Sequence, residues 1–323
     1  MKLRQFLVLL PAMAVLFGSG ACAAAQTYPD KPIAVVVPFP PGGPVDTLAR
    51  LLAGPMSRSM GQQLVIENKA GAGGSIGAAQ VARAAPDGYT LLMTASSYAM
   101  DPAIRSNLPF DPRRDMHGVV NVASGPVVLL AKTGLPVDAM DNFLALLRER
   151  PGKLSYASTG IGTVNHFAGE LFKGAAGVDA LHIPYNGAAP ATQAILAGEV
   201  DFFFNNVLSS VPHVQSGKVK ALAVTSEERW PAFPEVPTLR EAGVDVAISS
   251  WYGFFAPANT PEAVMERFAQ EVRKALADPQ VKDRIAQLGL TIEGAGPQAF
   301  QEYVGTEIDK WTAVAEAAGI EAQ

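Results

Sequence analysis

Several loops in this sequence combine glycine and hydroxyl side chains where an apolar run gives way to a helical pattern. In the first, the run at residues 33–37 leads through Gly42 and Gly43 into a helical pattern that starts near Pro44. Glycine lets the backbone turn tightly and expose its N–H groups, and Pro44 suits a first helical position. A helix N-terminus with free N–H donors attracts anions, carboxylates included. Asp46 either belongs to such a site or only stabilises the helix start, by about 0.3–1 kcal/mol.

A second and a third loop have the same character. Ser158, Thr159 and Thr163 place three hydroxyls around the start of another helical pattern. These neutral donors, together with free N–H groups, could hold a carboxylate. We expect His166, in the first turn, to support this loop rather than to act as a general base. In the third loop, at residues 183–190, Tyr185 could contact a ligand or cover the core.

A fourth loop contains a Gly-x-Ser-x-Gly match at Gly73, Ser75 and Gly77, the pattern of a hydrolase nucleophile. That motif requires the strand to end directly at the first glycine, whereas the apolar run here ends near residue 67 or 68. A dinucleotide fingerprint does not fit either, because Ile76 stands where its third glycine belongs. A secreted serine hydrolase that uses Ser75 with one of the histidines is therefore the least favoured function that we consider.

Little else in the sequence points to catalysis. The four histidines have no metal-ligand spacing, so we expect no metal site and no cofactor. The loops offer neutral donors from several places and few titratable groups poised for acid–base chemistry. This combination favours ligand binding, and we expect the protein not to be an enzyme.

The composition narrows the class of protein. The chain has 323 residues, of which 49% are hydrophobic and 17% charged. Such a length fits about two domains of roughly 150 residues each, with enough apolar residues to form cores. A disordered or fibrous chain is excluded. The formal net charge is −5 and no basic run stands out, so we expect no nucleic-acid partner.

The first 25 residues have the pattern of a secretory signal peptide. Lys2 and Arg4 precede a nearly continuous apolar stretch at residues 6–17, and small residues follow. The stretch is too short to span a bilayer, and no later apolar run approaches the ~18 residues that a transmembrane helix needs. We therefore predict that residues 1–25 direct export and are removed.

The single cysteine lies inside this segment. Cleavage after residue 25 would remove Cys22 and, with Lys2 and Arg4, two positive charges, which changes the formal net charge from −5 to −7. Lipoprotein anchoring through Cys22 is the alternative. It is disfavoured because Ser19 stands where a lipobox usually has Leu.

Short β-branched or aliphatic runs alternate with helical patterns along the rest of the chain. We predict strands at residues 33–37, 64–67, 90–94, 119–123, 127–131, 154–157, 181–183, 202–204, 221–224 and 250–256. Strand followed by helix, repeated, predicts an α/β fold with a mainly parallel sheet.

Two extended stretches suggest where the chain passes between lobes. The segment Ser124-Gly125-Pro126 joins two strand candidates in a way that favours a crossing over a hairpin, and residues 248–257 are followed by helical patterns only. We predict one lobe from residues 26–125 and 251–323, a second from residues 126–250, crossovers near 124 and 250, and a ligand cleft between the lobes. A single large α/β sheet is the alternative.

A series of ordered motifs also runs along essentially the whole chain after the signal segment. They are Tyr28-Pro-x-Lys-Pro-Ile33, Val37-Pro-Phe-x-x-Gly-Gly-x-x-Asp46, Arg50, Glu67-Asn68 with Gly71-Ala-Gly-Gly74, Pro86-Asp-Gly-Tyr-Thr90, His182-x-Pro-Tyr-x-Gly187, Ala221-Leu-Ala-Val-Thr225, Pro234-x-Val-Pro-Thr238 and Trp251. Together these motifs resemble the Bug/TctC family, the periplasmic solute-binding proteins of the tripartite tricarboxylate transporter class.

The resemblance implies a type II periplasmic-binding-protein fold, in which two α/β lobes close on a small organic acid. It implies a dicarboxylate, tricarboxylate, acidic amino acid or aromatic carboxylate as ligand, membrane permease subunits as partners, and a periplasmic location. We expect a monomer. Carried over position by position, the ligand contacts would be Phe39, Gly42, Gly43, Asp46, Thr94, Ser96, Ser158, Thr159, Gly160, Thr163, His166, Pro184, Tyr185 and Gly187.

One position departs from the family pattern. The family often has Lys between the Tyr and Gly of the His182-x-Pro-Tyr-x-Gly187 motif, and this chain has Asn186. With Asn186 at this position, a monocarboxylate or partly neutral ligand is favoured more than it would be with Lys. An extracytoplasmic sensor that presents its bound ligand to a membrane signalling partner is the alternative to a transport protein.

Overall fold

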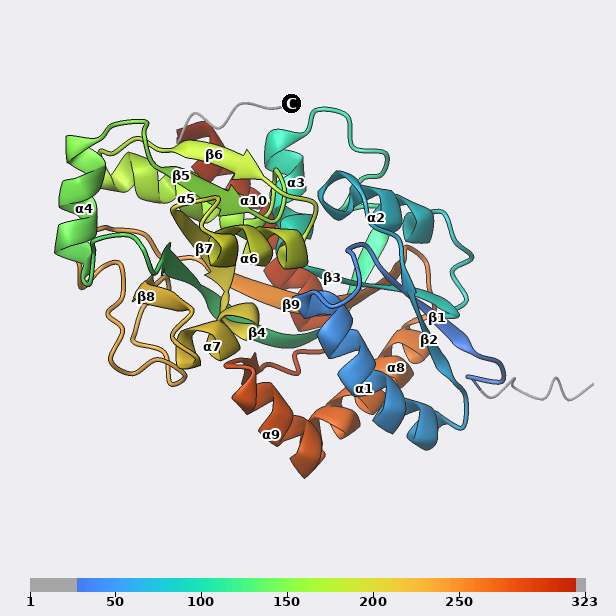
Figure 1. Cartoon of the computed structure of the whole chain (residues 1–323). Helices are drawn as coiled ribbons and strands as arrows, with labels where there is room; N and C mark the ends of the chain where they lie inside the picture. Colours follow the sequence, from blue (N-terminus) through green and yellow to red (C-terminus); the bar gives the residue numbers. More distant parts are fainter. Residues whose placement is uncertain (1–27, 318–323) are drawn as a thin grey trace, which may run out of the picture.

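The computed structural model describes residues 28–317, so the predicted signal peptide at residues 1–25 and Cys22 lie outside the described residues. Strands and helices alternate along the chain, as predicted for an α/β protein (Figure 1). The described strands are β1 (Ile33–Val37), β2 (Leu64–Asn68), β3 (Thr90–Ala95), β4 (Met116–Lys132), β5 (Ser155–Ser158), β6 (Leu181–Pro184), β7 (Phe202–Asn206), β8 (Val219–Val224), β9 (Ser249–Pro257) and β10 (Thr291–Ile292). The described helices are α1 (Pro44–Met60), α2 (Ser75–Ala82), α3 (Ser97–Ile104), α4 (Met140–Glu149), α5 (Val164–Ala176), α6 (Ala188–Ala197), α7 (Val207–Gln215), α8 (Glu262–Ala277), α9 (Pro279–Gln287) and α10 (Pro297–Ala317), with a short 3-10 turn η1 (Ala72–Gly74) before α2.

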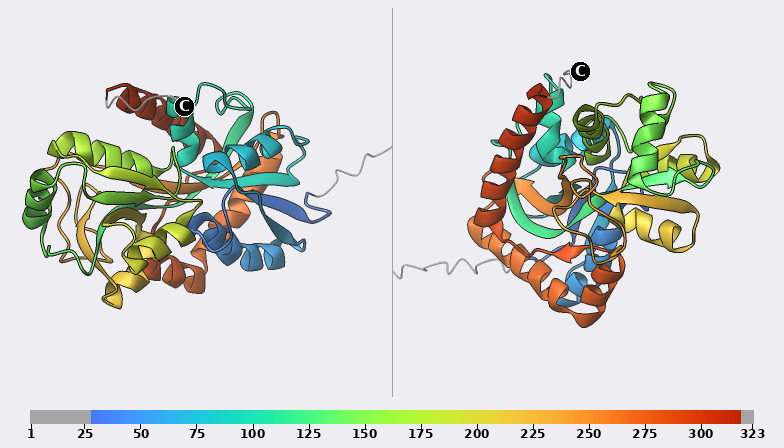
Figure 2. Two further views of the ribbon diagram at one scale, coloured as in Figure 1. Left: turned by 45° about the horizontal axis from the view of Figure 1, so that its top comes forward. Right: turned by 90° about the vertical axis from the view of Figure 1, so that its left-hand side faces the viewer.

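The sheet has two parallel halves joined by antiparallel strands. Strands β2, β1 and β3 are parallel and form the half that we call lobe 1, and β7, β5 and β6 are parallel and form lobe 2. Strand β9 pairs with β3, β4 pairs with β9, and β7 pairs with β4, all antiparallel. Because β4 and β9 run between the two halves, the lobes are held together by two long strands (Figures 1 and 2).

Strand β4 corrects the prediction of two strands at residues 119–123 and 127–131. The segment between them stays extended because Gly125 and Pro126 pair with Ser250 and Ser249 of β9. Besides β9, β4 pairs with β10 before Pro126, and after it with β7 on one edge and with β8 on the other. A proline has no N–H for a ladder hydrogen bond, and here it stands where the neighbouring strands change. Strand β10 also shows that the chain after β9 is not entirely helical.

Helices cover both faces of the sheet and enclose two hydrophobic cores. On one face, α1, α8 and α9 cover lobe 1 while α6 and α7 cover lobe 2, and on the other face α2, α3 and α10 cover lobe 1 while α4 and α5 cover lobe 2. The alternation of a strand distributes its residues between the cores, so that Val35 of β1 belongs to one and Val36 to the other. Each core contains residues of both lobes. The exact lobe boundaries at residues 125 and 250 remain a prediction.

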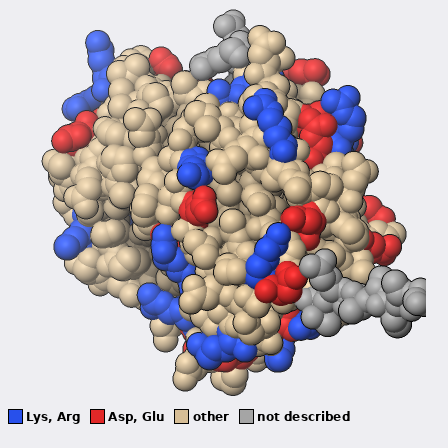
Figure 3. Space-filling model, turned by 90° about the vertical axis from the view of Figure 1, so that its right-hand side faces the viewer, with Lys and Arg blue, Asp and Glu red and all other residues tan. Residues whose placement is uncertain are grey.

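The outer end of lobe 1 carries acidic and basic side chains mixed with uncharged surface. Figure 3 shows both signs distributed over this face without a continuous basic stripe. A mixed surface of this kind gives no large field of one sign. Between residues 28 and 317, no helix is both long enough and apolar enough to cross a bilayer.

Candidate functional site

Five helices from both lobes begin at one cavity between the lobes. The residue that precedes the first turn of each helix lines the cavity: Gly43 before α1, Ser96 before α3, Thr163 before α5, Gly187 before α6 and Asn206 before α7. Strands β1, β3, β5, β6 and β7 end at these loops. In an open α/β sheet, ligands bind at the carboxyl ends of the strands, which is where this cavity lies.

The first turns of these helices keep N–H donors available. Helix N-termini leave N–H groups without partners in the helix, and a side chain at the preceding residue usually accepts from one of them. Here none of the five preceding residues makes such a bond, although Ser96, Thr163 and Asn206 have suitable side chains. Each helix also places the positive end of its dipole at the cavity. Such a cavity is suited to an anion.

The cavity is small and its lining is uncharged. Among the described residues, none of the side chains that line it is Lys, Arg, His, Asp or Glu. Its volume is about 50 Å³. Since about 10–15 Å³ of such volume accommodates one water, the cavity holds about three to five water-sized groups. We call it the inner cavity, and it has room for a carboxylate and the atoms next to it.

A chain of hydrogen bonds crosses the wall of the inner cavity from lobe 2 to β9. The Thr159 hydroxyl donates to Asn165 Oδ1 at 2.6 Å, Asn165 Nδ2 donates to Asn206 Oδ1 at 3.2 Å, and Asn206 Nδ2 donates to the Tyr252 hydroxyl at 3.1 Å. Because Tyr252 accepts at the end of this chain, its own proton is left to donate. Burial raises the pKa of Tyr252 to about 12, against the opposing effect of hydrogen bonds from Ser250 and Asn206. The phenol therefore stays protonated and is a neutral donor.

An outer hollow continues from the inner cavity. The two share Phe39, Pro40, Thr159 and Gly187, and the outer hollow has a volume of about 340 Å³. Its other walls are the glycine-rich segment at residues 70–74 and the turn that carries Tyr185 and Asn186. The side chains that line this hollow are likewise uncharged. A ligand with one end in the inner cavity could extend into it.

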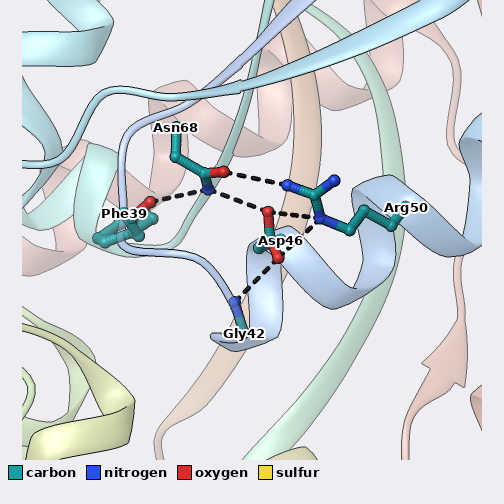
Figure 4. A network of polar contacts seen from close by, with 5 residues as sticks. All are labelled: Phe39, Gly42, Asp46, Arg50 and Asn68. Carbon is teal, nitrogen blue, oxygen red and sulfur yellow. Dashed lines mark hydrogen bonds and ion pairs between the residues drawn. The ribbon is translucent and has the colours of Figure 1, made fainter.

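Asp46 lies behind the first loop and holds it in place (Figure 4). Its carboxylate accepts from the Gly42 N–H at 2.9 Å, from Arg50 Nε at 3.0 Å and from Asn68 Nδ2 at 2.9 Å. Asn68 Nδ2 also donates to the Phe39 carbonyl, so that the loop is tied to the end of β2. Burial alone would raise the pKa of Asp46, but the hydrogen bonds from Arg50, Gly42 and Asn68 lower it below its ordinary value. Asp46 is thus an ionised positioning residue.

A stack of three aromatic rings supports the second loop from behind. The rings of His166 and His182 stack with centroids 4.4 Å apart, and Tyr156 stacks on the other face of His182 at 4.8 Å. His182 Nε2 lies 2.7 Å from the hydroxyl of Ser158, and His166 Nδ1 accepts from the Gly162 N–H at 3.4 Å. Burial lowers the pKa of His182 to about 4, and it also lowers the pKa of His166. Both histidine rings are therefore neutral near pH 7, and their contacts with Ser158 and Gly162 support residues 158–163.

The structure distributes the residues that we expected to contact a ligand over three places. In the walls of the inner cavity it places Phe39, Gly43, Ser96, Thr159, Thr163 and Gly187. Gly160 and Tyr185 line the outer hollow, and Phe39, Thr159 and Gly187 line both cavities. The rest lie outside both linings: Gly42 and Asp46 in the network of Figure 4, Thr94 within β3, Ser158 and His166 beside the ring stack, and Pro184 at the end of β6.

Five polar residues of the inner cavity are absent from the sequence expectation. One of them, Ser97, is the first residue of α3. Asn165 follows Thr163 at the start of α5, and Asn206 ends β7 directly before α7. A polar doublet such as Asn205-Asn206 after a run of phenylalanines is a signal that could have indicated a helix start. Ser250 and Tyr252 are two residues apart on the crossing strand β9, so their side chains point to the same face of the sheet.

The geometry around Ser75 lacks the features of a hydrolase nucleophile. Three residues after the end of β2 and a 3-10 turn precede it, and its hydroxyl donates to the Ala72 carbonyl at 3.1 Å. Among the described residues, the serine hydroxyl that contacts a histidine ring is that of Ser158, which is fully buried and also donates to the Gly160 carbonyl. In the described part of the chain, no three His, Cys, Asp or Glu side chains are grouped so that they could hold a metal ion.

Comparisons with known proteins give a consistent result. The sequence model of the family described as tripartite tricarboxylate transporter family receptor matches residues 48–320. The protein BugT of Bordetella pertussis is 34% identical over 322 residues, which cover 99% of this chain and 99% of BugT.

Solved structures resemble this chain over nearly all of their length. The periplasmic binding protein BugD is 36% identical with a TM-score of 0.88, covering 92% of this chain and all of BugD. A Rhodopseudomonas palustris protein solved with adipate is 33% identical with a TM-score of 0.87, covering 90% of this chain and 98% of that protein. MatC from the same organism, with bound malate, is 35% identical with a TM-score of 0.85, covering 89% of this chain and 99% of MatC.

The Asp46 network leads to a prediction about stability. We expect Asp46→Asn to lower the free energy of unfolding by about 1.5–3 kcal/mol near pH 7, because the charged acceptor of three donors is lost. A carboxylate with a lowered folded pKa stabilises above its ordinary pKa of about 4, and this stabilisation is lost as the pH falls through the folded value. The difference between wild type and variant should therefore shrink below about pH 4. Urea unfolding near pH 7 and near pH 3 measures both effects.

The control is Asp283→Asn on the exposed side of α9, which should change stability by no more than about 0.5 kcal/mol. An Asp46→Asn variant as stable as wild type near pH 7 would show that the network does not hold the loop.

Proposed function

Because the chain belongs to the tripartite tricarboxylate transporter receptor family, whose members are periplasmic solute-binding proteins, we propose that it captures a small organic carboxylate between its lobes. In this proposal the closed, loaded protein delivers the acid to a membrane permease. Export to the periplasm would depend on residues 1–25. The protein would act by binding and would not transform its ligand.

The observation that carries the proposal is the meeting of five uncapped helix starts at one uncharged cavity. A carboxylate needs several donors at short range, and N–H groups with aligned helix dipoles supply them without a cationic side chain. The Tyr252 hydroxyl, which accepts from Asn206 and keeps its own proton, adds a neutral donor. A net negative protein does not attract anions over long distances, so the binding energy must come from these local donors.

The shape of the cleft supports an elongated ligand. The inner cavity accommodates one carboxylate end, and the outer hollow is several times larger. The relatives solved with adipate and malate bind linear dicarboxylates of different length. We propose that the carboxylate end of the ligand lies at the five helix starts and that the remaining part passes Phe39 and Gly187 into the outer hollow. Uncharged walls there suit a neutral or weakly polar second end.

A panel of organic acids tests this function directly. We expect at least one linear mono- or dicarboxylate, in a panel that includes adipate and malate, to raise the melting temperature and to give a calorimetric binding signal. Adipamide, which has the same chain length as adipate but no charge, should not bind, because the helix starts favour an anion. The proposal fails if no acid binds or if adipamide binds as tightly as adipate.

A proline substitution tests the role of the backbone donors. Ala188 is the first residue of α6 and follows Gly187, whose extended ψ of 178° accommodates a following proline. Ala188→Pro removes one N–H from the cavity wall while the helix start is retained, since proline is favoured at this position. We expect the dissociation constant for the bound acid to rise about tenfold, the lower end for a bond to a charged group. Isothermal titration calorimetry measures it.

The matched control is Glu262→Pro at the first position of α8, which is exposed and lies outside the lining of both cavities. Affinity should be unchanged there. Equal affinities for wild type and Ala188→Pro would mean that this N–H does not contact the ligand.

The outer hollow gives a prediction about ligand charge. Asn186 lines it and is exposed. Asn186→Lys places a cation there, so the preference for adipate over its monomethyl ester should increase about two- to fivefold, as for an exposed ion pair. Competition binding of the two compounds measures this ratio. Asn186→Gln keeps the site neutral and should leave the ratio unchanged. A ratio that is also unchanged in Asn186→Lys would place the second end of the ligand elsewhere.

A further inference from the structure

Outside both cavities, the end of α3 in lobe 1 contacts the loop before α5 in lobe 2. The Arg105 guanidinium donates to the Ile161 carbonyl across the cleft at 3.4 Å and to the Asp101 carboxylate of its own helix at 3.1 Å. Asp101 is 3% exposed, and neither it nor Arg105 lines the inner cavity or the outer hollow. The contact joins the lobes independently of a ligand.

The contact is closely packed and depends on glycine. Gly162 has a φ of 84°, and a Cβ atom there would lie 2.6 Å from Ile104 Cδ1 and 3.0 Å from Asp101 Oδ1. A Cβ atom on Gly73 would lie 3.1 Å from both Arg105 Nη2 and the Ile161 carbonyl oxygen. A side chain at Gly162 would therefore displace the end of Ile104, and one at Gly73 would push Arg105 and the Ile161 carbonyl apart by a few tenths of an ångström. Both glycines thus let the lobes approach until Arg105 reaches the other side.

Helix α3 connects this contact to the ligand site. Ser96 and Ser97 at its start line the inner cavity, whereas Ile104 and Arg105 at its end touch lobe 2. Helix α3 has eight residues and is about 12 Å long. The inner cavity and the contact with lobe 2 therefore lie at the two ends of one short helix. Closing the lobes brings both ends of α3 into position at the same time.

We propose that Arg105 and Asp101 form a latch that holds the two lobes closed and so sets ligand affinity without touching the ligand. The latch is Arg105 and Asp101 on α3 together with Ile161 and Gly162 in lobe 2. The inference rests on the proposed binding function. Removing the latch shifts the equilibrium toward the open state, from which the ligand leaves.

Asp101 gives the latch a dependence on pH. Burial raises the pKa of Asp101 to about 7, and the attraction of Arg105 opposes this rise. Part of that burial comes from Gly162 of the other lobe, so opening returns Asp101 to water and lowers its pKa. Closing therefore takes up a proton. Affinity should be greatest below neutral pH and should fall by up to about tenfold per pH unit as the pH rises toward 7.

The other groups near the latch do not titrate in this range or pair elsewhere. Residues 160–162 and the turn at residues 72–74 carry no titratable side chain. On α10, which packs against α3, Glu307 pairs with Lys310, and Asp309 pairs with Arg113. His166 behind Gly162 has a pKa that burial lowers. Asp101 is thus the buried carboxyl group of the latch, and burial raises its pKa to about 7.

The test uses the acid from the panel that binds wild type. Arg105→Met should raise the dissociation rate of this acid about tenfold and should change its association rate little. The reason is that the bond from the charged Arg105 to lobe 2 exists only in the closed state, so its loss destabilises that state alone. Arg105→Lys keeps a donor and should recover part of the loss. Asp101→Asn should abolish the fall in affinity between about pH 5 and 7. Stopped-flow kinetics and calorimetry at several pH values measure these quantities.

A glycine pair separates closure from backbone strain. Gly162→Ala inserts a methyl group between the lobes and should speed dissociation. Gly177→Ala is the matched control, because Gly177 also has a positive φ, of 62°, but has no atom within 4 Å of its Cβ position. Dissociation at wild-type rates in Arg105→Met and Gly162→Ala would overturn the latch, as would a pH dependence that persists in Asp101→Asn.

Small-angle scattering keeps this test distinct from that of the binding function. If no acid of the panel binds wild type, the binding function fails, and the latch is judged by the radius of gyration of the unliganded proteins. A larger radius in Arg105→Met and Gly162→Ala than in wild type and Gly177→Ala supports the latch. Equal radii in all four proteins overturn it.

Discussion

The unsatisfied N–H groups of five helix starts are the constraint on which the site depends. Each group needs an acceptor, and none of the preceding residues provides one from its side chain. The surrounding structure keeps the donors directed at the inner cavity. Asp46 and Asn68 hold the first loop, and the stack of Tyr156, His182 and His166 holds the second. The hydrogen bonds of Asn165 and Asn206 join the starts of α5 and α7 to β9. The charged groups Asp46 and Arg50 and the two histidines thus lie behind the loops, and the lining of the inner cavity is uncharged.

The two crossing strands determine how the halves of the site come together. Strands β4 and β9 pair along their whole shared length, and both hydrophobic cores continue from one lobe into the other. The lobes therefore approach each other about a common, well-packed spine. Their contact surfaces include Gly73, Gly162 and Gly187. These glycines face the Ile161 carbonyl, the Ile104 and Asp101 side chains, and Pro40 on the other lobe. The same residue type that frees the loops to turn also allows the lobes to close.

Most of the strands and the glycine loops could be predicted from the sequence because their signals are local. At residues 33–46, for example, an apolar run, two glycines and the start of a helical pattern follow one another closely. The order of the family motifs along the chain supports the same assignment of strands and loops. The role of Asp46 could not be read in the same way, because the direction of its side chain depends on Arg50 and Asn68. For His166 the sequence indicates a supporting role but not the stack on His182, which is distant in sequence. Tyr252 and Asn206 meet only through the register of β9 and β7 on either side of β4, which is a property of the whole sheet.

The position of β9 also has a consequence for the order in which the molecule can assemble. Strand β9 lies between β3 and β4, so β3 and β4 are joined only through a segment that ends at Pro257. The sheet of lobe 1 cannot be completed until that part of the chain is present, although β1, β2 and β3 belong to its first hundred residues. Pairing between segments so far apart in sequence slows folding. The topology thus keeps the growing chain from completing the sheet of lobe 1 until β9 has been made.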